Sequence, residues 1–289
     1  MKIRAPAKIN LNLRVLGKRP DGYHLLDTVM LPVSLYDEIE IRRIRSEGNT
    51  NSHDEGLIKV SCDHPLVPGG EKNIVYRAAR LIIQRAKSEP SVRIHIRKRI
   101  PVGAGLGGGS TDAAATLIGL NRMLRLRFSQ TTLEKMALSL GADVPFFIRA
   151  RPARARGIGE RLYPLRRVPR FWLVIVYPGF PVSTAWAFRK LPSTLTKAPV
   201  NTSIPSSLKS FDRLANLLVN DLEIVTLKRY PKIRLLKERL LHQGAAGGLM
   251  SGSGSSVFGI FGSRRQAAKA WRRLRQEEGA DAFLVHVLS

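Results

Sequence analysis

The chain has 289 residues, of which 44% are hydrophobic, and it carries a formal net charge of +26. This apolar content excludes a mainly disordered chain. The apolar runs are far shorter than the roughly 20 residues of a membrane-spanning helix. The first residues also lack the apolar segment of a signal peptide. A single cysteine excludes an internal disulfide, and no paired Cys and His spacing indicates a metal site, so we expect a soluble cytoplasmic protein.

Alternating polar and apolar residues predict strands in the first half of the chain. In chain order, we expect a strand at 3–17, a strand at 34–44, an amphipathic helix at 71–86, a strand at 91–100 and a helix after the glycines at 103–109. A further helix is expected at 131–141, ended by Gly141. Asp143 is expected in the short loop that follows, with Pro145 preventing any helix from continuing.

A basic segment containing proline and glycine, residues 151–159, is expected to connect the two halves of the chain. For the second half we expect, in order, a buried strand at 171–178, a loop at 191–207, helices at 213–225 and 231–243, a small-residue stretch at 244–262, a basic helix at 263–276 and a strand at 282–288. Because helices and strands mix without a regular βαβ alternation, the pattern favours an α+β fold.

The excess of basic residues is the compositional feature that sets this chain apart. A surface rich in Lys and Arg can bind nucleic acid by releasing counterions from the phosphate backbone, and it can also be a solvated surface that attracts small anions. No zinc-finger spacing and no aromatic signature of an RNA-binding domain accompanies the charge. Nucleic acid is therefore not expected as the main ligand.

Five of the seven residues from Gly103 to Gly109 are glycine. Glycine adopts positive φ at low cost and lets a ligand approach the backbone closely. The stretch leads through Ser110, Thr111 and Asp112 into a helix-forming segment, which is not typical of a flexible linker. The free N–H groups of such a loop and the dipole of the helix favour an anion, most often phosphate. We therefore interpret the stretch as a phosphate-binding loop.

Better-known phosphate-binding motifs do not fit this loop. Gly103, Gly105 and Gly108 match the G-x-G-x-x-G pattern of dinucleotide-binding folds, but the acidic residue expected about 20 residues later is missing. Residues 122–132 are basic instead. The sequence also lacks a Walker A motif, the HRD and DFG motifs of protein kinases and the G-x-S-x-G motif of serine hydrolases.

The loop sequence PVGAGLGGGSTDAA, residues 101–114, resembles the nucleotide loop of the GHMP kinase superfamily. PAKINLNL at 6–13, GADVPFF at 141–147 and SGSGSSVFG at 251–259 agree with the same superfamily, so the resemblance covers most of the chain. Within it, PAKIN, RPDGYHLLDT and GADVPFF are similar to the members whose acceptor is diphosphocytidyl methylerythritol, in the non-mevalonate route to isoprenoid precursors.

The resemblance implies an α+β kinase with two domains and an active site in the cleft between them. Residues 1–160 would form the N-terminal, ATP-binding domain and residues 161–289 the C-terminal domain. ATP and Mg²⁺ are the implied cofactors, and the 2-hydroxyl of the acceptor would receive the γ-phosphate. No cluster of metal-ligating side chains is predicted, and the oligomeric state is left open.

Phosphoryl transfer requires an aligned hydroxyl, stabilised charge and a proton acceptor. Asp143 is the only carboxylate in the small and apolar segment 141–147, which makes it the candidate base; a surface or capping aspartate is the alternative. Lys8 and Asn10 share one face of an alternating strand, a face that usually contacts solvent. The resemblance implies that Asp143 and Lys8 are catalytic and that Asn10 contacts the substrate.

Residues 21–24, DGYH, would by default form a turn. Tyr23 and His24 supply an aromatic face and a hydrogen-bonding ring, which suit a cytosine base. The resemblance implies that both bind this base and that Phe188 packs on its other side. From the residues alone, a helical core position is favoured for Phe188.

The resemblance also implies the ATP-binding residues. They are Asn73, near the adenine, and the loop residues Pro101, Val102, Gly103, Ala104, Gly105, Leu106, Gly107, Gly108, Gly109, Ser110 and Thr111. The hydroxyls of Ser110 and Thr111 would contact the phosphates or Mg²⁺. Asn73 also fits a helix N-cap, and the two roles are compatible.

Two features leave questions for the structure. The late loop 251–259 is expected either to form a tight turn or to flank the cleft near the substrate. Residues 149–156 are rich in arginine where the family has more glycine, so the sequence leaves undecided which residues form the edge of the substrate pocket. The alternatives to the implied function are the same fold acting on mevalonate, homoserine or a sugar, and a nucleic-acid-binding protein on this fold.

Overall fold

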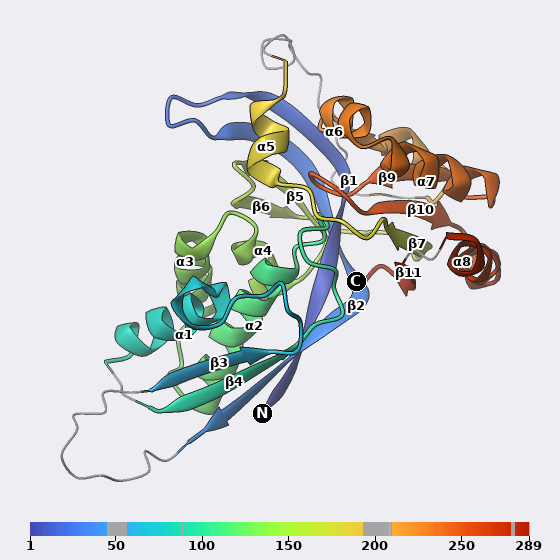
Figure 1. Ribbon diagram of the computed structural model, residues 1–289. Coiled ribbons are helices and arrows are strands. Elements are labelled where there is room, and N and C mark those ends of the chain that lie inside the picture. Colours follow the sequence, from blue (N-terminus) through green and yellow to red (C-terminus); the bar gives the residue numbers. More distant parts are fainter. Residues whose placement is uncertain (45–56, 88–89, 193–207, 209, 279–280, 289) are drawn as a thin grey trace. The chain divides into compact units, whose positions relative to one another are not determined.

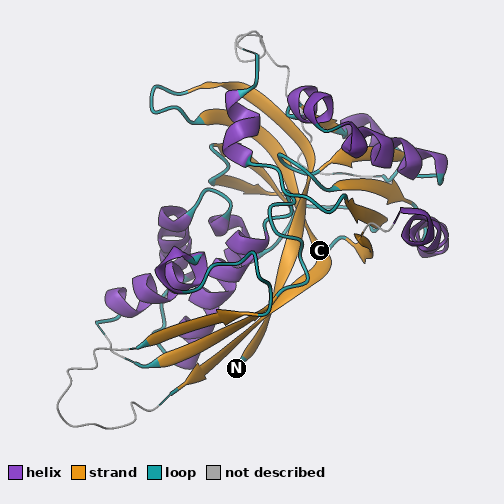
Figure 2. Ribbon diagram, viewed as in Figure 1, coloured by secondary structure: helices purple, strands orange, loops and turns teal. Residues whose placement is uncertain are grey.

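The computed structural model describes all residues except 45–56, 88–89, 193–207, 209, 279–280 and 289 (Figure 1). The loop expected at 191–207 therefore lies almost entirely outside the described residues. In the described part of the chain helices and strands are mixed without regular alternation (Figure 2). This mixture confirms the α+β prediction.

The chain forms two compact units, each assembled from separate segments. Unit 1 contains residues 1–7, 36–102 and 108–150, and unit 2 contains residues 8–35, 103–107 and 151–289. Strands β1 (Lys2–Lys18) and β2 (His24–Arg43) contribute residues to both units. The predicted domains 1–160 and 161–289, and the cleft between them, stay predictions.

Unit 1 combines a group of helices with strands β3, β4 and part of β2, which belong to the seven-stranded sheet of the described residues. Strand β4 (Val92–Arg97) pairs antiparallel with β2 and parallel with β3 (Ile58–Cys62). The helices are η1 (Gly70–Lys72), α1 (Ile74–Arg85), α2 (Gly108–Met123), α3 (Gln130–Leu140) and α4 (Val144–Arg149). A Cβ on Gly119 of α2 would lie 2.5 Å from the side chains of Ile3 and Ile41. The helix therefore approaches the sheet more closely than a larger residue would permit.

Unit 2 contains the remaining strands and helices. They are β5 (Ala153–Gly157), β6 (Arg161–Pro164), β7 (Trp172–Tyr177), α5 (Thr184–Arg189), η2 (Ala215–Leu217), β8 (Val219–Asn220), α6 (Glu223–Arg229), α7 (Pro231–His242), β9 (Gly247–Met250), β10 (Val257–Phe261), α8 (Arg264–Glu278) and β11 (Asp281–His286). Strands β11, β7, β10 and β9 form an antiparallel sheet in that order. Helices α7 and α8 pack on this sheet and bury Ile233, Leu236 and Leu240 of α7 with Ala267, Ala270 and Leu274 of α8.

Most of the predicted elements are present in the structure. The strands expected at 3–17, 34–44, 91–100, 171–178 and 282–288 correspond to β1, part of β2, β4, β7 and β11, and the helices expected at 71–86, 131–141, 231–243 and 263–276 correspond to α1, α3, α7 and α8. Hydrophobic periodicity identified them because each has one buried face. Among the described residues, no helix combines the length and apolarity needed to cross a membrane.

One helix was not anticipated, and two local predictions were wrong. Residues 144–149 form α4, and Pro145 stands in its first turn, where proline is favoured because the N–H that it lacks has no helical partner there. Residues 153–157 form strand β5 instead of a simple connection, and they pair antiparallel with β2. The helix expected at 213–225 is divided into η2, β8 and the start of α6.

The division of 213–225 has a tertiary cause. Val219 and Asn220 pair with Asn12 and Leu13 of β1, and the Asn220 side chain donates 2.8 Å hydrogen bonds to the carbonyls of Met250 and Gly252. These partners are far away in sequence. Local helix propensity could not reveal them, because it reports only on neighbouring residues.

Candidate functional site

The glycine-rich loop has the conformation that its sequence predicts. Gly103, Gly105 and Gly107 have positive φ angles of 65°, 76° and 74°, a region that side chains with a Cβ rarely adopt. Helix α2 then begins at Gly108. The glycines therefore serve two purposes, since they bend the chain sharply and they lead it directly into a helix N-terminus.

The carbonyl groups of four consecutive loop residues are bonded to other segments of unit 2. The pairs are Val182 N to Gly103 O at 3.1 Å, Ser256 N to Ala104 O at 3.1 Å, Ser251 Oγ to Gly105 O at 3.0 Å and Lys8 N to Leu106 O at 2.9 Å. In a trans peptide the C=O and the following N–H point in opposite directions. The N–H groups of residues 104–107 are therefore turned away from these donors, as in a backbone anion site.

The late loop 251–256 packs directly on the backbone of the glycine loop. A Cβ on Gly105 would lie 2.0 Å from the carbonyl oxygen of Ser251 and 3.0 Å from that of Gly254. A Cβ on Gly252 would lie 3.2 Å from the Gly105 oxygen. This segment was expected as a tight turn or as a flank of the substrate site. The structure shows that it supports the glycine loop, and its proximity to substrate stays a prediction.

Helix α2, which follows the loop in sequence, begins in unit 1. The first turn of an α-helix carries N–H groups with no partner inside the helix, and these groups favour an anion. Ser110 in this turn is half-buried, whereas Thr111 is only 1% exposed. Of the two hydroxyls predicted to contact the phosphates, that of Ser110 is therefore the more accessible.

Strand β1 places Lys8 and Asn10 in a buried polar chain. Lys8 Nζ donates to Asn10 Oδ1 at 2.6 Å, and Asn10 Nδ2 donates to Thr28 Oγ1 at 2.8 Å. The Thr28 hydroxyl then donates to the carbonyl of Asn12 at 2.5 Å. Lys8 is 4% and Asn10 2% exposed. The face that alternation normally assigns to solvent is therefore buried, and the chain orients the amide of Asn10.

Asp143 lies at the N-terminal end of α4. It occupies the N-cap position, but its side chain makes no capping hydrogen bond. Asp143 therefore does not cap the helix. Its side chain is half-buried. Asp143 belongs to unit 1 and Lys8 to unit 2, and their joint action at one acceptor stays a prediction.

The structure brings His24 and Phe188 together. Their rings stack with centroids 5.1 Å apart and an interplanar angle of 25°. Phe188 lies in α5, which is capped by the Ser183 side chain. Tyr23, at the turn made by Gly22, is 59% exposed. Since His24 and Phe188 are already in contact, a base cannot lie between these two rings in this arrangement, whereas the Tyr23 ring is open to stacking.

Burial and charge affect the protonation of His24. Burial is the larger cause and the nearby Lys18 the smaller, and together they lower the pKa of His24 below its ordinary value. A neutral imidazole has one donor and one acceptor nitrogen. His24 can therefore offer both kinds of hydrogen bond to a base at neutral pH.

Asn73 acts as a helix cap. Its Oδ1 accepts from Val75 N at 2.9 Å, and its Nδ2 donates to the carbonyl of Pro68 at 2.8 Å. The side chain is buried. The capping role expected for this residue is thus observed, and its contact with adenine stays a prediction.

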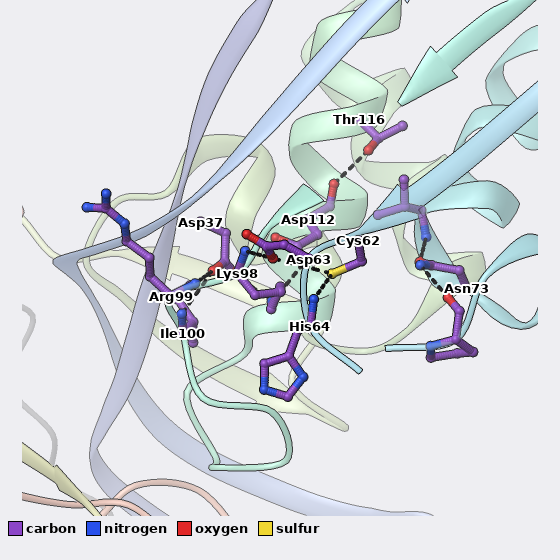
Figure 3. Close-up of polar contacts among 12 residues, drawn as sticks. Asp37, Cys62, Asp63, His64, Asn73, Lys98, Arg99, Ile100, Asp112 and Thr116 are labelled. Carbon is purple, nitrogen blue, oxygen red and sulfur yellow. Dashed lines mark hydrogen bonds and ion pairs between the residues drawn. The ribbon is translucent and has the colours of Figure 1, made fainter. Parts of the chain in front are cut away.

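A buried charged group in unit 1 was not anticipated from the sequence (Figure 3). Lys98 Nζ lies 2.5 Å from Asp37 Oδ2 and 2.8 Å from Asp112 Oδ2. Burial is the main cause that raises the pKa of Asp112 to about 8, and Asp37 adds to it while Lys98 opposes it. Burial alone would lower the pKa of Lys98, but the two carboxylates raise it.

Strand alternation was the sequence signal for this group. Asp37 falls on the same side of β2 as the buried Leu35, Ile39 and Ile41. Lys98 continues the buried positions of β4, such as Ile96. A charged residue at an inward position needs a buried partner of opposite charge, so the two positions together predict an ion pair.

A second buried ion pair involves the arginine-rich segment. Arg154 Nε donates to Asp27 Oδ1 at 2.7 Å, and Arg154 Nη2 contacts the other carboxylate oxygen. Arg156 Nη2 lies 3.7 Å from the same group. Asp27 is fully buried. At least part of the arginine content at 149–156 is therefore required to neutralise a carboxylate within the sheet.

Comparison with known families identifies two regions of the chain. The profile of the GHMP kinases N terminal domain matches residues 73–151, and that of the GHMP kinases C terminal domain matches residues 202–281. Together these regions account for more than half of the sequence. They include the glycine loop and the segment that contains Asp143.

Relatives match over the full length of the chain. A protein of Citrifermentans bemidjiense named 4-diphosphocytidyl-2-C-methyl-D-erythritol kinase is 46% identical over 288 residues, covering 100% of this chain and 99% of that protein. A protein of Syntrophotalea carbinolica with the same name is 49% identical over 281 residues, covering 97% and 96%. The crystal structure of a 4-(cytidine 5'-diphospho)-2C-methyl-D-erythritol kinase has a TM-score of 0.82 at 34% identity and covers 100% of both chains.

Proposed function

Because the chain belongs to the GHMP kinase family, we propose that it transfers the γ-phosphate of ATP to the 2-hydroxyl of 4-diphosphocytidyl-2-C-methyl-D-erythritol. The observation that carries this proposal is the full-length similarity to relatives named for this kinase activity. The reaction belongs to the non-mevalonate route to isoprenoid precursors. Mevalonate, homoserine or sugar acceptors, and nucleic acid as the main ligand, are not favoured. The cytoplasmic location expected from the sequence stays a prediction.

The glycine loop is the proposed site for the ATP phosphates. Its support is the set of four bonded carbonyls, each of which turns the next N–H group along the chain, in residues 104–107, away from the carbonyl's donor. These groups and the N-terminus of α2 can stabilise the negative charge of the transferring phosphoryl group. We assign residues 101–111 to the phosphates and Asn73 to the neighbourhood of the adenine.

Magnesium is the proposed metal, bound together with ATP. Within the described residues, no three His, Cys, Asp or Glu side chains gather into a metal cage. Mg²⁺ usually binds through the phosphates of the nucleotide and few protein oxygens. The accessible hydroxyl of Ser110 is the protein oxygen that we assign to it. When bound, the ion neutralises charge on the β- and γ-phosphates.

The acceptor hydroxyl requires a group to take its proton. We assign this role to Asp143, the half-buried carboxylate at the N-terminal end of α4. Lys8 supplies positive charge to the same step. Its ammonium is oriented by Asn10, which Thr28 orients in turn.

The cytosine base is assigned to Tyr23 and His24. The exposed Tyr23 ring offers a stacking face, and neutral His24 offers hydrogen bonds. We assign Phe188 to the same base-binding group, where it packs on His24 and holds the imidazole in place. Asn10 is assigned to the methylerythritol end of the substrate.

An assay of purified protein tests the proposal. The protein is incubated with ATP, Mg²⁺ and diphosphocytidyl methylerythritol, and the 2-phosphate product is detected by mass spectrometry and ³¹P NMR. Mevalonate and homoserine are assayed in parallel as alternative acceptors. Faster phosphorylation of either alternative would contradict the assigned acceptor. Binding of RNA with no ATP turnover would contradict the kinase function.

A further inference from the structure

The segment that precedes the glycine loop is held by two carboxylates of unit 1 (Figure 3). Lys98 N donates to Asp63 Oδ1 at 2.8 Å, while Arg99 N and Ile100 N donate to Asp37 Oδ1 at 2.6 and 2.9 Å. Three consecutive N–H groups thus bind carboxylate oxygens, and the next residue, a proline, has no N–H. The path of the chain toward the loop is therefore fixed by charged acceptors, which form stronger bonds than neutral ones.

The Lys98 side chain joins this segment to helix α2. Its ammonium lies between Asp37 on β2 and Asp112 in the N-terminal part of α2. The side chains of the three residues are at most 4% exposed. A Cβ on Gly108, the first residue of α2, would lie 3.0 Å from Lys98 Nζ. The ammonium thus lies beside the start of the helix as well as beside the Asp112 carboxylate.

Stability alone is a weak explanation for this arrangement. Buried charges lose their hydration, and apolar residues of similar volume are often at least as stable in their place. Asp112 Oδ1 is also buried with no hydrogen-bond partner among the described residues, which adds to the cost of burying the group. What the ion pairs do provide is direction, because Lys98 can satisfy both carboxylates only when α2 and the end of β4 keep one relative placement.

We propose that Asp37, Lys98 and Asp112 form a positioning triad that holds the first turn of α2 in register with the end of β4. The turn so positioned contains residues 108–111, whose N–H groups are assigned to the ATP phosphates and whose Ser110 hydroxyl is assigned to the Mg²⁺ bound with them. The inference therefore rests on that assignment under the proposed function. None of the three residues touches substrate; the triad acts through the backbone of the helix.

The variant Asp112→Ala removes the link to α2 and leaves Lys98 paired with Asp37. We expect KM for ATP to rise by about tenfold, since a displacement of about 1 Å in a positioned group can cost about a hundredfold in rate. KM for the diphosphocytidyl acceptor should stay within about twofold of wild type. The conservative variant Asp112→Asn keeps an oxygen that can accept from Lys98, and it should restore KM for ATP to near the wild-type value.

Asp221 provides a matched control in unit 2. It is a buried carboxylate that pairs with Arg14 at 3.0 Å and accepts from Val15 N at 2.8 Å. Asp221→Ala should lower the thermal midpoint as Asp112→Ala does, but it should leave KM for ATP unchanged. If both variants lower the midpoint and neither changes KM for ATP, the triad is only structural and the inference fails. Equal changes in KM for ATP and for the acceptor would overturn it as well.

Two further variants keep the test decisive. If Asp112→Ala does not fold, Asp112→Ser replaces it, since serine is too short to reach Lys98 but its hydroxyl can hydrogen-bond to a backbone carbonyl one turn earlier in the helix; the same outcomes then apply. Ser110→Ala is measured in parallel, because it tests the loop assignment independently of the triad. If Ser110→Ala changes KM for ATP and the variant at position 112 does not, the triad inference fails while the loop assignment stands. No change in either variant defeats the loop assignment and the triad together.

Discussion

Asp143 is the residue on which the proposed chemistry depends most directly. Asp143→Asn keeps the size of the side chain but removes its ability to accept the proton of the acceptor hydroxyl. We expect kcat to fall by about 10² to 10⁴, the range typical of a lost general base, with KM for ATP little changed. Steady-state kinetics measure both constants. Near-normal kcat would remove Asp143 from this role.

Protonation of His24 should make KM for the acceptor depend on pH, and this dependence can be measured separately from the role of Asp143 in kcat. Burial and Lys18 lower its pKa below the ordinary value of about 6.5, so the imidazole is mostly neutral at pH values above about 6.5. We expect KM for the acceptor to be constant over this range and to rise only at lower pH, where protonation removes the acceptor nitrogen. The measurement is the pH profile of KM.

His24→Asn should raise this KM at every pH and abolish its rise at low pH. His242→Asn, at the exposed end of α7, serves as the control and should keep the wild-type profile. A profile that is unaltered in His24→Asn would show that another group titrates.

At the scale of elements, two loops of small residues support each other. The glycine loop and the late loop 251–256 approach so closely that Gly105 has no room for a Cβ beside Ser251. Each loop therefore depends on the other for its conformation. Neither the turn geometry nor the glycine content of one loop alone explains why so many small residues are needed.

Two alanine variants separate packing from ligand approach. Gly105→Ala combines a positive φ with a contact of 2.0 Å, so we expect loss of stability by about 1–3 kcal/mol and loss of ATP binding. At Gly109 a Cβ would meet only Ile74, at an ordinary 3.8 Å. Gly109→Ala should therefore keep its stability, and any rise in KM for ATP would come from contact with the nucleotide.

Thermal unfolding and ATP kinetics on both variants make the comparison, with Gly69→Ala as the control in open space. Unchanged stability in Gly105→Ala would contradict the close packing of the two loops. Strong destabilisation in Gly109→Ala would contradict the open environment of that glycine.

At the scale of the whole molecule, the net charge of +26 exceeds what one ion pair or one phosphate site requires. Some arginines neutralise buried carboxylates, as Arg154 does for Asp27, but those of α8 lie on its exposed side. A positive surface attracts anions over distances up to the Debye length. Both proposed substrates are anions, so the charge favours their association.

This attraction predicts a dependence on ionic strength. Raising NaCl from about 0.01 M to about 0.5 M, which shortens the Debye length several-fold, should lower kcat/KM for both ATP and the acceptor while leaving kcat unchanged. Initial rates over a salt series measure this, with circular dichroism as a control for folding. A salt-independent kcat/KM would assign the charge to some purpose other than substrate attraction.

The sequence by itself determined the elements whose information is local. The φ angles of the glycine loop, the helix that follows it and the strands with one buried face could all be predicted, because glycine freedom, capping and periodicity depend on neighbouring residues. The family could also be predicted, since its motifs are contiguous. Asn73 as a helix cap was recognised from the residue type and its position.

The tertiary structure alone decided the features that join distant segments. These include the contact between the glycine loop and residues 251–256, the stacking of His24 on Phe188, the strand at 219–220 and the pairing of Lys98 with Asp37 and Asp112. Strand alternation marked Asp37 and Lys98 as inward-facing charges but could not name their partner on α2. Such contacts depend on how separated segments fold against one another, and no local pattern of residues encodes that placement.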